Sequence, residues 1–342
     1  MAQIAKAGPA KAGLQVRRLT PKDLAAVTEI DATLGGRTRP AFHERRLQAA
    51  QRAPSHYAQF AVEERGVVLG YVLGRMLEGE FGRSAPAMRL EVIGVKAEAQ
   101  GRGAGLALSR ALEDEARKRG LREMRTGCEW RDHSMMRFLD RAGYQLARHH
   151  VIDCAIGEAK LGSRAEEPVV IEGHERPSDQ HDYSAPAAND FEQLARDTAE
   201  IRSLAASDLE DVVRIDRRLT GRDRSAYIGH KFDDALKESA IRLSLVARRQ
   251  GAAAGYLMAS ADYGNFGRAE PVAVLDTIGV DPNFARTGVA KAMLSQLYIN
   301  LGALRIERVE TLLGRENYGL LGFFYKMGFV PSQNLAFVKP LG

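Results

Sequence analysis

Apolar and polar residues follow one another in an order that predicts the same set of elements twice along the chain. In the first half, alternation and apolar runs predict strands at residues 14–19, 57–64, 67–77, 88–95 and 124–128, with one or two closing strands in 144–156. Helices are predicted to begin at the capping-box sequence Thr20–Asp23 and to cover residues 40–51, 103–119 and 134–141. This order of elements predicts an α/β domain with a mixed sheet.

Short sequence matches recur at a constant offset of 185 residues, which predicts two copies of one domain. The matched segments are Phe81-Gly82-Arg83 with Phe266-Gly267-Arg268, Ile93-Gly94-Val95 with Ile278-Gly279-Val280, and Gly36-Arg37 with Gly221-Arg222. We therefore expect a flexible tail at 1–13, domains at 14–155 and 199–340, and a polar acidic linker at 156–198. Within the linker, residues 169–171 have the pattern of a short strand.

Composition indicates what class of protein this is but says little about its activity. A length of 342 residues suits two domains, and no apolar run reaches the length of a membrane span. No signal-peptide pattern is present, so a soluble, cytoplasmic protein is expected. Cys128 and Cys154 are too few and too far apart for a zinc site, so we expect no bound metal and two buried thiols.

Charge is distributed unevenly. Residues 157–197 carry ten acidic and four basic side chains, although the net charge of the whole chain is +5. The remainder is therefore distinctly basic, which suits either nucleic acid or a phosphorylated small molecule. The chain has no recognition-helix pattern and no aromatic stacking motif, so nucleic acid is the less favoured partner.

A glycine-rich turn between a predicted strand and a long predicted helix carries the clearest chemistry. Its residues are Gln100, Gly101, Arg102, Gly103, Ala104 and Gly105. Free N–H groups at a helix start attract anions, and glycine lets a phosphate approach them closely. The turn predicts a pyrophosphate cradle; the alternative is that its glycines only permit a tight turn.

This turn fits the Q/R-x-x-G-x-G/A motif and resembles the acyl-CoA loop of the GCN5-related N-acetyltransferases (GNATs). The resemblance covers most of both halves and implies two tandem GNAT folds, each a mixed, mainly antiparallel twisted sheet flanked by helices. It also implies acetyl-CoA as the acyl donor. The second copy of the loop is Ala285, Arg286, Thr287, Gly288, Val289 and Ala290. Ala285 stands where the family prefers Gln or Arg, so we expect weaker binding there, with Arg286 as a candidate phosphate partner.

A second family signature resembles residues 317–329, in which Asn317 occupies a position that usually contacts the cofactor. In the first half Asp132 replaces this residue. Many members use a tyrosine to protonate the leaving thiolate, but Leu139 and Phe324 hold that position here. Tyr325 is the alternative candidate acid, although one residue further around a helix it would point elsewhere; a packing or surface tyrosine is the other interpretation.

Amine acetylation needs a base, because an ammonium group is not nucleophilic. Glu91 and Asp276 are equivalent acids on otherwise apolar strands and are the candidate bases. Each could instead lie on a polar face or pair with Arg83 or Arg268. In the family, main-chain amides of the same strand assist the thioester, which here points to Ile93, Gly94, Val95, Ile278, Gly279 and Val280.

The resemblance implies an acetyl-CoA-dependent N-acetyltransferase that moves an acetyl group directly to a primary amine on a small molecule, a protein N-terminus or a lysine. The alternative is an acyl-CoA-binding regulatory protein with one or both halves catalytically degenerate. Loop arginines at 37–39 and 222–224 could hold an acceptor's carboxylate or phosphate, or be solvated or salt-bridged. Trp130 has no aromatic counterpart, so the halves are expected to take different acceptors. A doubly wound nucleotide-binding domain is excluded because the glycine-rich turn follows late strands. The oligomeric state stays open.

Overall fold

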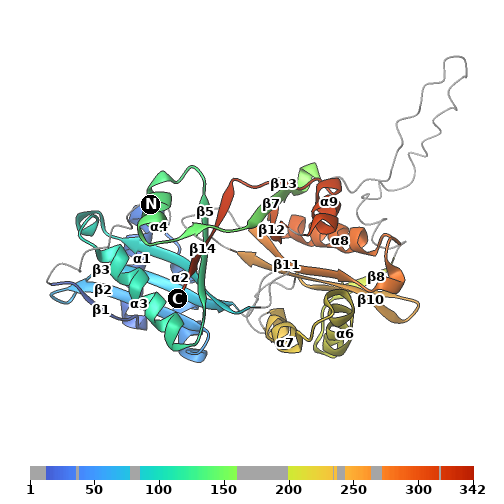
Figure 1. Cartoon of the computed structure of the whole chain (residues 1–342), viewed down its shortest axis with the longest axis horizontal. Helices are drawn as coiled ribbons and strands as arrows, with labels where there is room; N and C mark the ends of the chain where they lie inside the picture. Colours follow the sequence, from blue (N-terminus) through green and yellow to red (C-terminus); the bar gives the residue numbers. More distant parts are fainter. Residues whose placement is uncertain are drawn as a thin grey trace, which may run out of the picture.

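The computed structural model describes residues 13–35, 38–77, 85–159, 199–233, 235–236, 243–262, 272–315 and 317–342. In this part of the chain two sheets of seven strands lie side by side, each flanked by helices (Figure 1). Within each sheet most neighbouring strands are antiparallel, with one parallel pair near the middle. The predicted α/β class with mixed, mainly antiparallel sheets is confirmed.

The elements of the first half match the predicted order closely. Its strands are β1 (Gln15–Arg18), β2 (Tyr57–Glu64), β3 (Val67–Leu77), β4 (Ala87–Val95), β5 (Glu123–Glu129), β6 (Gln145–Leu146) and β7 (His149–Ala155). Its helices are α1 (Leu24–Gly35), α2 (Pro40–Arg52), α3 (Ala104–Lys118) and α4 (His133–Arg141). Asp23 accepts from the Thr20 N–H at 2.8 Å, so the predicted capping box is present; it opens a short 3-10 turn before α1.

The second half repeats this series. Its strands are β8 (Glu200–Ser203), β9 (Leu245–Arg249), β10 (Ala252–Asp262), β11 (Val272–Val280), β12 (Arg308–Gly314), β13 (Val330–Pro331) and β14 (Asn334–Pro340). Its helices are α6 (Leu209–Thr220), α7 (Ser225–Asp233), α8 (Val289–Ala303) and α9 (Tyr318–Lys326).

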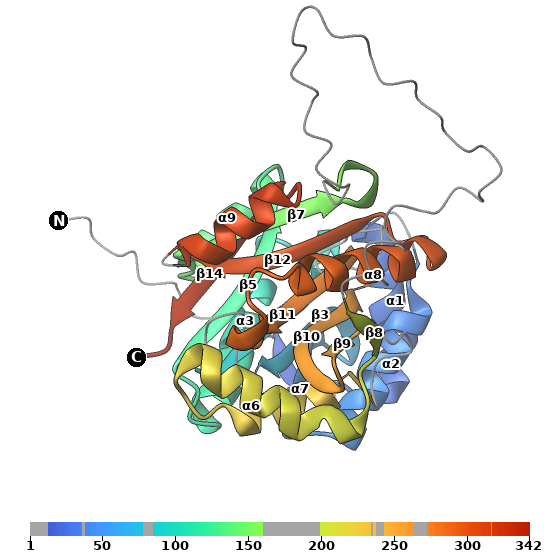
Figure 2. The same cartoon turned by 90° about the vertical axis from the view of Figure 1, so that its right-hand side faces the viewer.

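Each sheet is packed on both faces by amphipathic helices. In the first half, α3 covers one face through a core that includes Leu108 and Leu112, and α1 and α2 cover the other through Ile30 and Phe42. In the second half α8 and α9 lie on one side of the sheet and α6 and α7 on the other (Figure 2). Each sheet therefore has a helical layer on both of its faces.

The two halves exchange their last long strands. β7 comes from the first half but pairs with β12 of the second sheet over seven residues, and β14 pairs with β5 of the first sheet over seven residues. In Figure 1 the red strand β14 accordingly lies among green and blue strands, and the green strand β7 beside orange ones. These strands occupy equivalent positions in the repeat, 185 residues apart. Ile152 of β7 and Phe337 of β14 are buried in the cores of the opposite halves.

Several sequence-based predictions concern residues outside the described ones. They are most of the tail at 1–13, the linker from 160 to 198 with its strand-like run at 169–171, the pair Gly36-Arg37, and the segments 81–83 and 266–268. Both cysteines are buried, as the sequence predicted, and neither is in a disulfide.

Candidate functional site

The central parallel strands of each sheet separate partway along their length. β4 and β5 pair only at Met88–Arg89 with Met124–Arg125 in the described residues. The Thr126 hydroxyl donates to the Leu90 carbonyl at 2.9 Å and closes this pairing. Beyond that point β4 continues beside β3 alone, so its edge toward β5 lacks a strand partner over residues 91–95. Part of the main chain of β4 thus has no strand partner among the described residues, in the stretch that contains Ile93, Gly94 and Val95.

The second half separates its strands in the same way. β11 and β12 pair at Ala273–Val274 with Val309–Glu310. The Thr311 hydroxyl donates to the Leu275 carbonyl at 2.9 Å, matching the contact made by Thr126. Residues 278–280 therefore lie on a strand edge equivalent to residues 93–95.

The two candidate bases occupy identical irregularities in their strands. The register of β3 with β4 shifts so that Glu91 is an extra residue between Leu90 and Val92. The register of β10 with β11 shifts at the same place, and Asp276 is the extra residue. A β-bulge re-aims a side chain at the point where regular pairing is interrupted. In both halves the bulge therefore sets the direction of the carboxylate, at the point where the parallel strands begin to separate.

Cationic side chains hold Glu91 in place. Its Oε1 lies 2.9 Å from a terminal nitrogen of Arg46 on α2 and 3.2 Å from Nε of Arg75 on β3. Glu91 is 1% exposed, and its Oε2 has no hydrogen-bond partner among the described residues. Asp276 is less enclosed: it pairs with Lys231 at 2.9 Å and accepts from the Ser260 hydroxyl at 3.3 Å. A buried carboxylate oxygen without a partner is costly unless a ligand or water satisfies it.

Two glycines of the glycine-rich turn have a left-handed backbone. Gly101 and Gly103 have φ values of 72° and 93°, in the left-handed region that favours glycine, and Gly103 is the N-cap of α3. A Cβ at either position would meet no protein atom within 4 Å. Gly103 has no side chain to cap the helix, so the first N–H groups of α3 remain for another acceptor.

The remaining loop residues have structural partners. Gln100 donates to the carbonyl of Val95 at 3.1 Å, which ties the loop back to the end of β4. Arg102 pairs with Glu64 at 2.5 Å. Ala104 is buried in the core, and a Cβ on Gly105 would lie 3.1 Å from the ring of Phe138 on α4. The side chains of this loop therefore contact other parts of the protein and fix the shape of the loop.

The second loop repeats this geometry at a cost. Gly288 has a φ of 88° and caps α8 without a side chain, followed by buried Val289 and half-buried Ala290. Arg286 occupies the position of Gly101 and has a φ of 61°. A left-handed conformation costs a residue with a Cβ about 1–2 kcal/mol. Arg286 and Thr287 are exposed, and the Thr287 hydroxyl donates to the Phe284 carbonyl at 2.7 Å.

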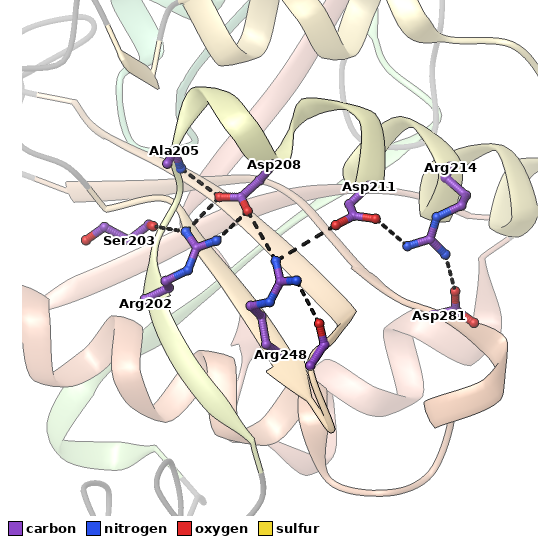
Figure 3. A network of polar contacts seen from close by, with 9 residues as sticks. Arg202, Ser203, Ala205, Asp208, Asp211, Arg214, Arg248 and Asp281 are labelled. Atoms are coloured by element: carbon purple, nitrogen blue, oxygen red, sulfur yellow. Dashed lines mark hydrogen bonds and ion pairs between the residues drawn. The ribbon is translucent and has the colours of Figure 1, made fainter.

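A network of charges anchors the strand end that leads into this second loop. Asp281, directly after β11, is 1% exposed and contacts Arg214 of α6 at 3.2 Å (Figure 3). From Arg214 the contacts continue through Asp211 and Arg248 to Asp208. In the first half Lys96 replaces Asp281 and lies 3.6 Å from Glu29, which occupies the position of Arg214. The same connection therefore exists in both halves with its charges reversed.

The repeated glycine at the middle of the Ile-Gly-Val motif has a packing role. A Cβ on Gly94 would lie 2.7 Å from the ring of Tyr71, and one on Gly279 would lie 2.6 Å from the ring of Tyr256. Each tyrosine hydroxyl donates to a buried carboxylate, Tyr71 to Asp31 at 3.1 Å and Tyr256 to Asp216 at 3.0 Å. Burial, with the facing Asp31 carboxylate, raises the pKa of Tyr71.

The loop arginines are divided between the two interpretations. Arg39 pairs with Asp31 at 2.6 Å and Arg224 with Asp216 at 2.7 Å, so both are salt-bridged parts of the fold. Burial by itself would raise the pKa of Asp31, but the close approach of His43 and the hydrogen bonds from Arg39 outweigh it and hold that pKa well below its usual range. Arg222 is exposed in the loop after α6.

The residues of the second signature begin or fill the last helices. Asp132 accepts from the Met135 N–H at 2.9 Å, and Asn317 accepts from the Leu320 N–H at 3.4 Å, so both are N-caps. Leu139 and Phe324, at the position of the family tyrosine, are completely buried. Tyr325 is 42% exposed near the end of α9.

Comparisons with known proteins agree with this geometry. A model of the acetyltransferase (GNAT) family matches residues 25–144 and 196–329, so each match spans one strand separation and one glycine-rich turn. The chain belongs to the GNAT family. Its two halves are tandem GNAT folds, and no curated protein matches the sequence significantly.

Solved structures of GNAT proteins resemble the fold of this chain at low sequence identity. The tandem GNAT protein from the clavulanic acid biosynthesis pathway is 15% identical, with a TM-score of 0.59, and the match covers 96% of this chain and 99% of that one. A GNAT from Sphaerobacter thermophilus is 13% identical, with a TM-score of 0.53 and 96% of both chains covered. A fungal multi-domain β-N-acetylglucosaminidase with a glucosamine N-acetyltransferase region is 13% identical, with a TM-score of 0.61. That match covers 97% of this chain, which spans 38% of the fungal one.

Sequence reasoning missed the cations around the candidate bases and the exchanged strands. Arg46 and Lys231 stand 185 residues apart, so the repeat register marks them as cations at equivalent positions, but it does not show that they contact Glu91 and Asp276. No helix in the described part of the chain is long and apolar enough to cross a membrane.

Proposed function

We propose that this GNAT protein is an acetyl-CoA-dependent N-acetyltransferase that transfers the acetyl group directly to a primary amine. The observation that supports this function best is that an open strand edge runs into an uncapped helix N-terminus in both halves. A strand edge left open by the separation of β4 and β5 leads directly into an uncapped helix N-terminus at Gly103. The same sequence of features ends at Gly288 in the second half.

Each feature suits one end of the donor. The uncapped N–H groups and the helix dipole would hold the pyrophosphate of CoA. The open main-chain groups at residues 93–95 and 278–280 would bind the pantetheine chain and polarise the thioester carbonyl. The Cβ-free faces of Gly101 and Gly103 give a phosphate room to approach the backbone.

The bulged carboxylates would serve the acceptor. The Oε2 of Glu91 can accept the proton of the attacking amine, directly or through a water, as the new C–N bond forms and the C–S bond breaks. The proton balance closes when the CoA thiolate takes up a proton from solvent or from a side chain. Tyr325 is the candidate for that step in the second half.

Replacing the candidate bases tests this assignment. Glu91→Gln and Asp276→Asn should each lower kcat of their own half by about 100-fold or more, because a positioned base contributes on that scale. Acetyl-CoA affinity, measured by calorimetry, should be unchanged, and Glu210→Gln on the exposed side of α6 is the matched control. Full activity in the double variant would refute a role for both carboxylates.

A regulatory acyl-CoA-binding protein is the second candidate. Leu139 and Phe324 favour this candidate. They are buried apolar side chains at the position where many members of the family carry a tyrosine. A screen of amines that follows CoA release separates the two functions, because the regulatory protein would bind acetyl-CoA without releasing CoA to any acceptor. NAD and ATP should stabilise the protein much less than acetyl-CoA does under either function.

A further inference from the structure

Three arginines form a row across the first sheet. Arg75 on β3 is the direct cross-strand partner of Arg89 on β4, and Arg89 is in turn the partner of Arg125 on β5. Directly opposite residues on neighbouring strands project to the same face with Cβ atoms about 5 Å apart. Met88 and Leu90, on either side of Arg89, belong to the core beneath α3. The row therefore lies on the opposite face, the one covered by α1 and α2.

The flanking arginines of the row are paired and the central one is not. Arg75 contacts Glu91, and Arg125 pairs with Glu123 and donates to the Ala85 carbonyl at 3.0 Å. Arg89 is half-buried and makes no hydrogen bond or ion pair with any described residue. Like charges placed directly opposite one another destabilise a sheet. A central arginine between two others is thus a place where an anion would be bound favourably.

This row lies next to the candidate base. Glu91 follows Arg89 by two residues on β4, a separation of about 7 Å along a strand. Arg46 adds a further guanidinium from α2, so this part of the described structure holds four arginines and the two carboxylates of Glu91 and Glu123. The excess positive charge stands where an acceptor amine must approach Glu91.

The second half lacks this row. Ser260, Val274 and Glu310 occupy the positions of Arg75, Arg89 and Arg125, and Ser260 and Val274 are likewise cross-strand partners. There Lys231 is the cation that pairs with Asp276 among the described residues. The bulge and the strand separation are the same in both halves, so the row is a difference between two otherwise similar backbones.

We infer that the arginine row Arg75, Arg89 and Arg125 is an anion subsite for the acceptor of the first half. The inference rests on the proposed function. The acceptor is a small amine that carries a carboxylate or a phosphate a few bonds from its nitrogen. The anion binds at Arg89 and thereby places the amine beside Glu91. The second half takes an acceptor without this anion.

Direct binding to the full chain tests the subsite without depending on turnover. Four probes share a short carbon chain: propylamine and ethanolamine lack an anion, β-alanine carries a carboxylate, and phosphoethanolamine carries a phosphate. Calorimetry should show at least one anionic probe binding ten-fold or more tighter than the neutral ones. The better anionic probe identifies the carboxylate or the phosphate as the group recognised.

Arg89→Val, which introduces the residue of the second half, should remove 10- to 100-fold of that affinity, as expected for a hydrogen-bonded charge. It should leave propylamine and acetyl-CoA binding unchanged and should not lower Tm, because it removes a repulsion. Arg52→Ser, at the exposed end of α2, is the matched control.

Equal affinity for anionic and neutral probes would overturn the subsite, as would an anion preference that survives Arg89→Val. A fall in Tm with the preference intact would show that Arg89 has a purely structural role. A wild-type protein that does not bind acetyl-CoA would refute the proposed function instead. The two failures can be told apart because the measurement of anion binding uses no acyl donor.

Discussion

At the residue scale, the two halves keep ion pairs at equivalent positions even where the residue types differ. Arg17 with Asp23 and Arg202 with Asp208 are retained pairs, whereas the contact of Lys96 with Glu29 has its charges reversed in the second half. The sequence identified candidate residues, such as Glu91, from their position. It could not assign their partners, because Arg46 approaches Glu91 from a helix 45 residues away.

The ion pair of Arg17 with Asp23, at the start of the first domain, should make the stability of the protein depend on pH in acid. The Arg17 hydrogen bonds hold the pKa of Asp23 at about 2, against the opposing effect of burial. The unfolded carboxyl titrates near 3.9, so the stabilisation is complete above about pH 4 and is lost as the pH falls toward 2.

Arg17→Ala should lower the free energy of unfolding by about 1–2 kcal/mol at pH 7, since solvent screens a pair whose arginine is 37% exposed. Urea unfolding at pH 7, 4 and 3 should show this difference shrinking with acid. A difference that stays constant over the range would contradict the assignment, and Arg52→Ala serves as the control.

At the scale of elements, the sequence predicted most boundaries to within one or two residues. Periodicity and caps are local signals, so β2 and β3 begin and end as expected. The bulges at Glu91 and Asp276 were not predicted, because they depend on how a strand registers with its neighbour. The same applies to the separation of β4 from β5, which no single-strand pattern encodes.

The packing of β4 against β3 should be sensitive to one methyl group. Gly94→Ala would place a Cβ 2.7 Å from the Tyr71 ring, and overpacking of this kind costs about 1–3 kcal/mol. Gly302→Ala, in α8 with no atom within 4 Å of the added Cβ, should be neutral or slightly stabilising. Chemical denaturation compares the two, and equal stabilities would show that the contact with Tyr71 relaxes freely.

At the scale of the molecule, the sequence predicted the duplication but did not predict the strand exchange. β7 and β14 are equivalent segments, so either could satisfy the same hydrogen bonds in either sheet. No local pattern decides between the two arrangements. The exchange makes each sheet depend on the other half for one long strand, and Lys339 of β14 is held by Glu113 of α3 at 2.7 Å.

Limited proteolysis should therefore cut the chain without separating it. We propose that the acidic linker is cleaved first, around residues 158–197, and leaves two fragments near half the chain mass. Because the fragments share strands, they should co-elute in size-exclusion chromatography and separate only in denaturant. Fragments that separate under native conditions would contradict the exchange, and first cuts inside either half would contradict the proposed domain boundaries.

The central claim is that both glycine-rich turns are acetyl-CoA sites of unequal strength. Gly103→Val and Gly288→Val would each put a branched side chain at a φ near 90° and into the space left for a phosphate. The first loop keeps glycine where Arg286 is strained in the second, so the first site should bind more tightly. Calorimetric titration of acetyl-CoA should show two phases, with Gly103→Val removing the tighter and Gly288→Val the weaker. A single wild-type site that Gly288→Val abolishes would contradict the account.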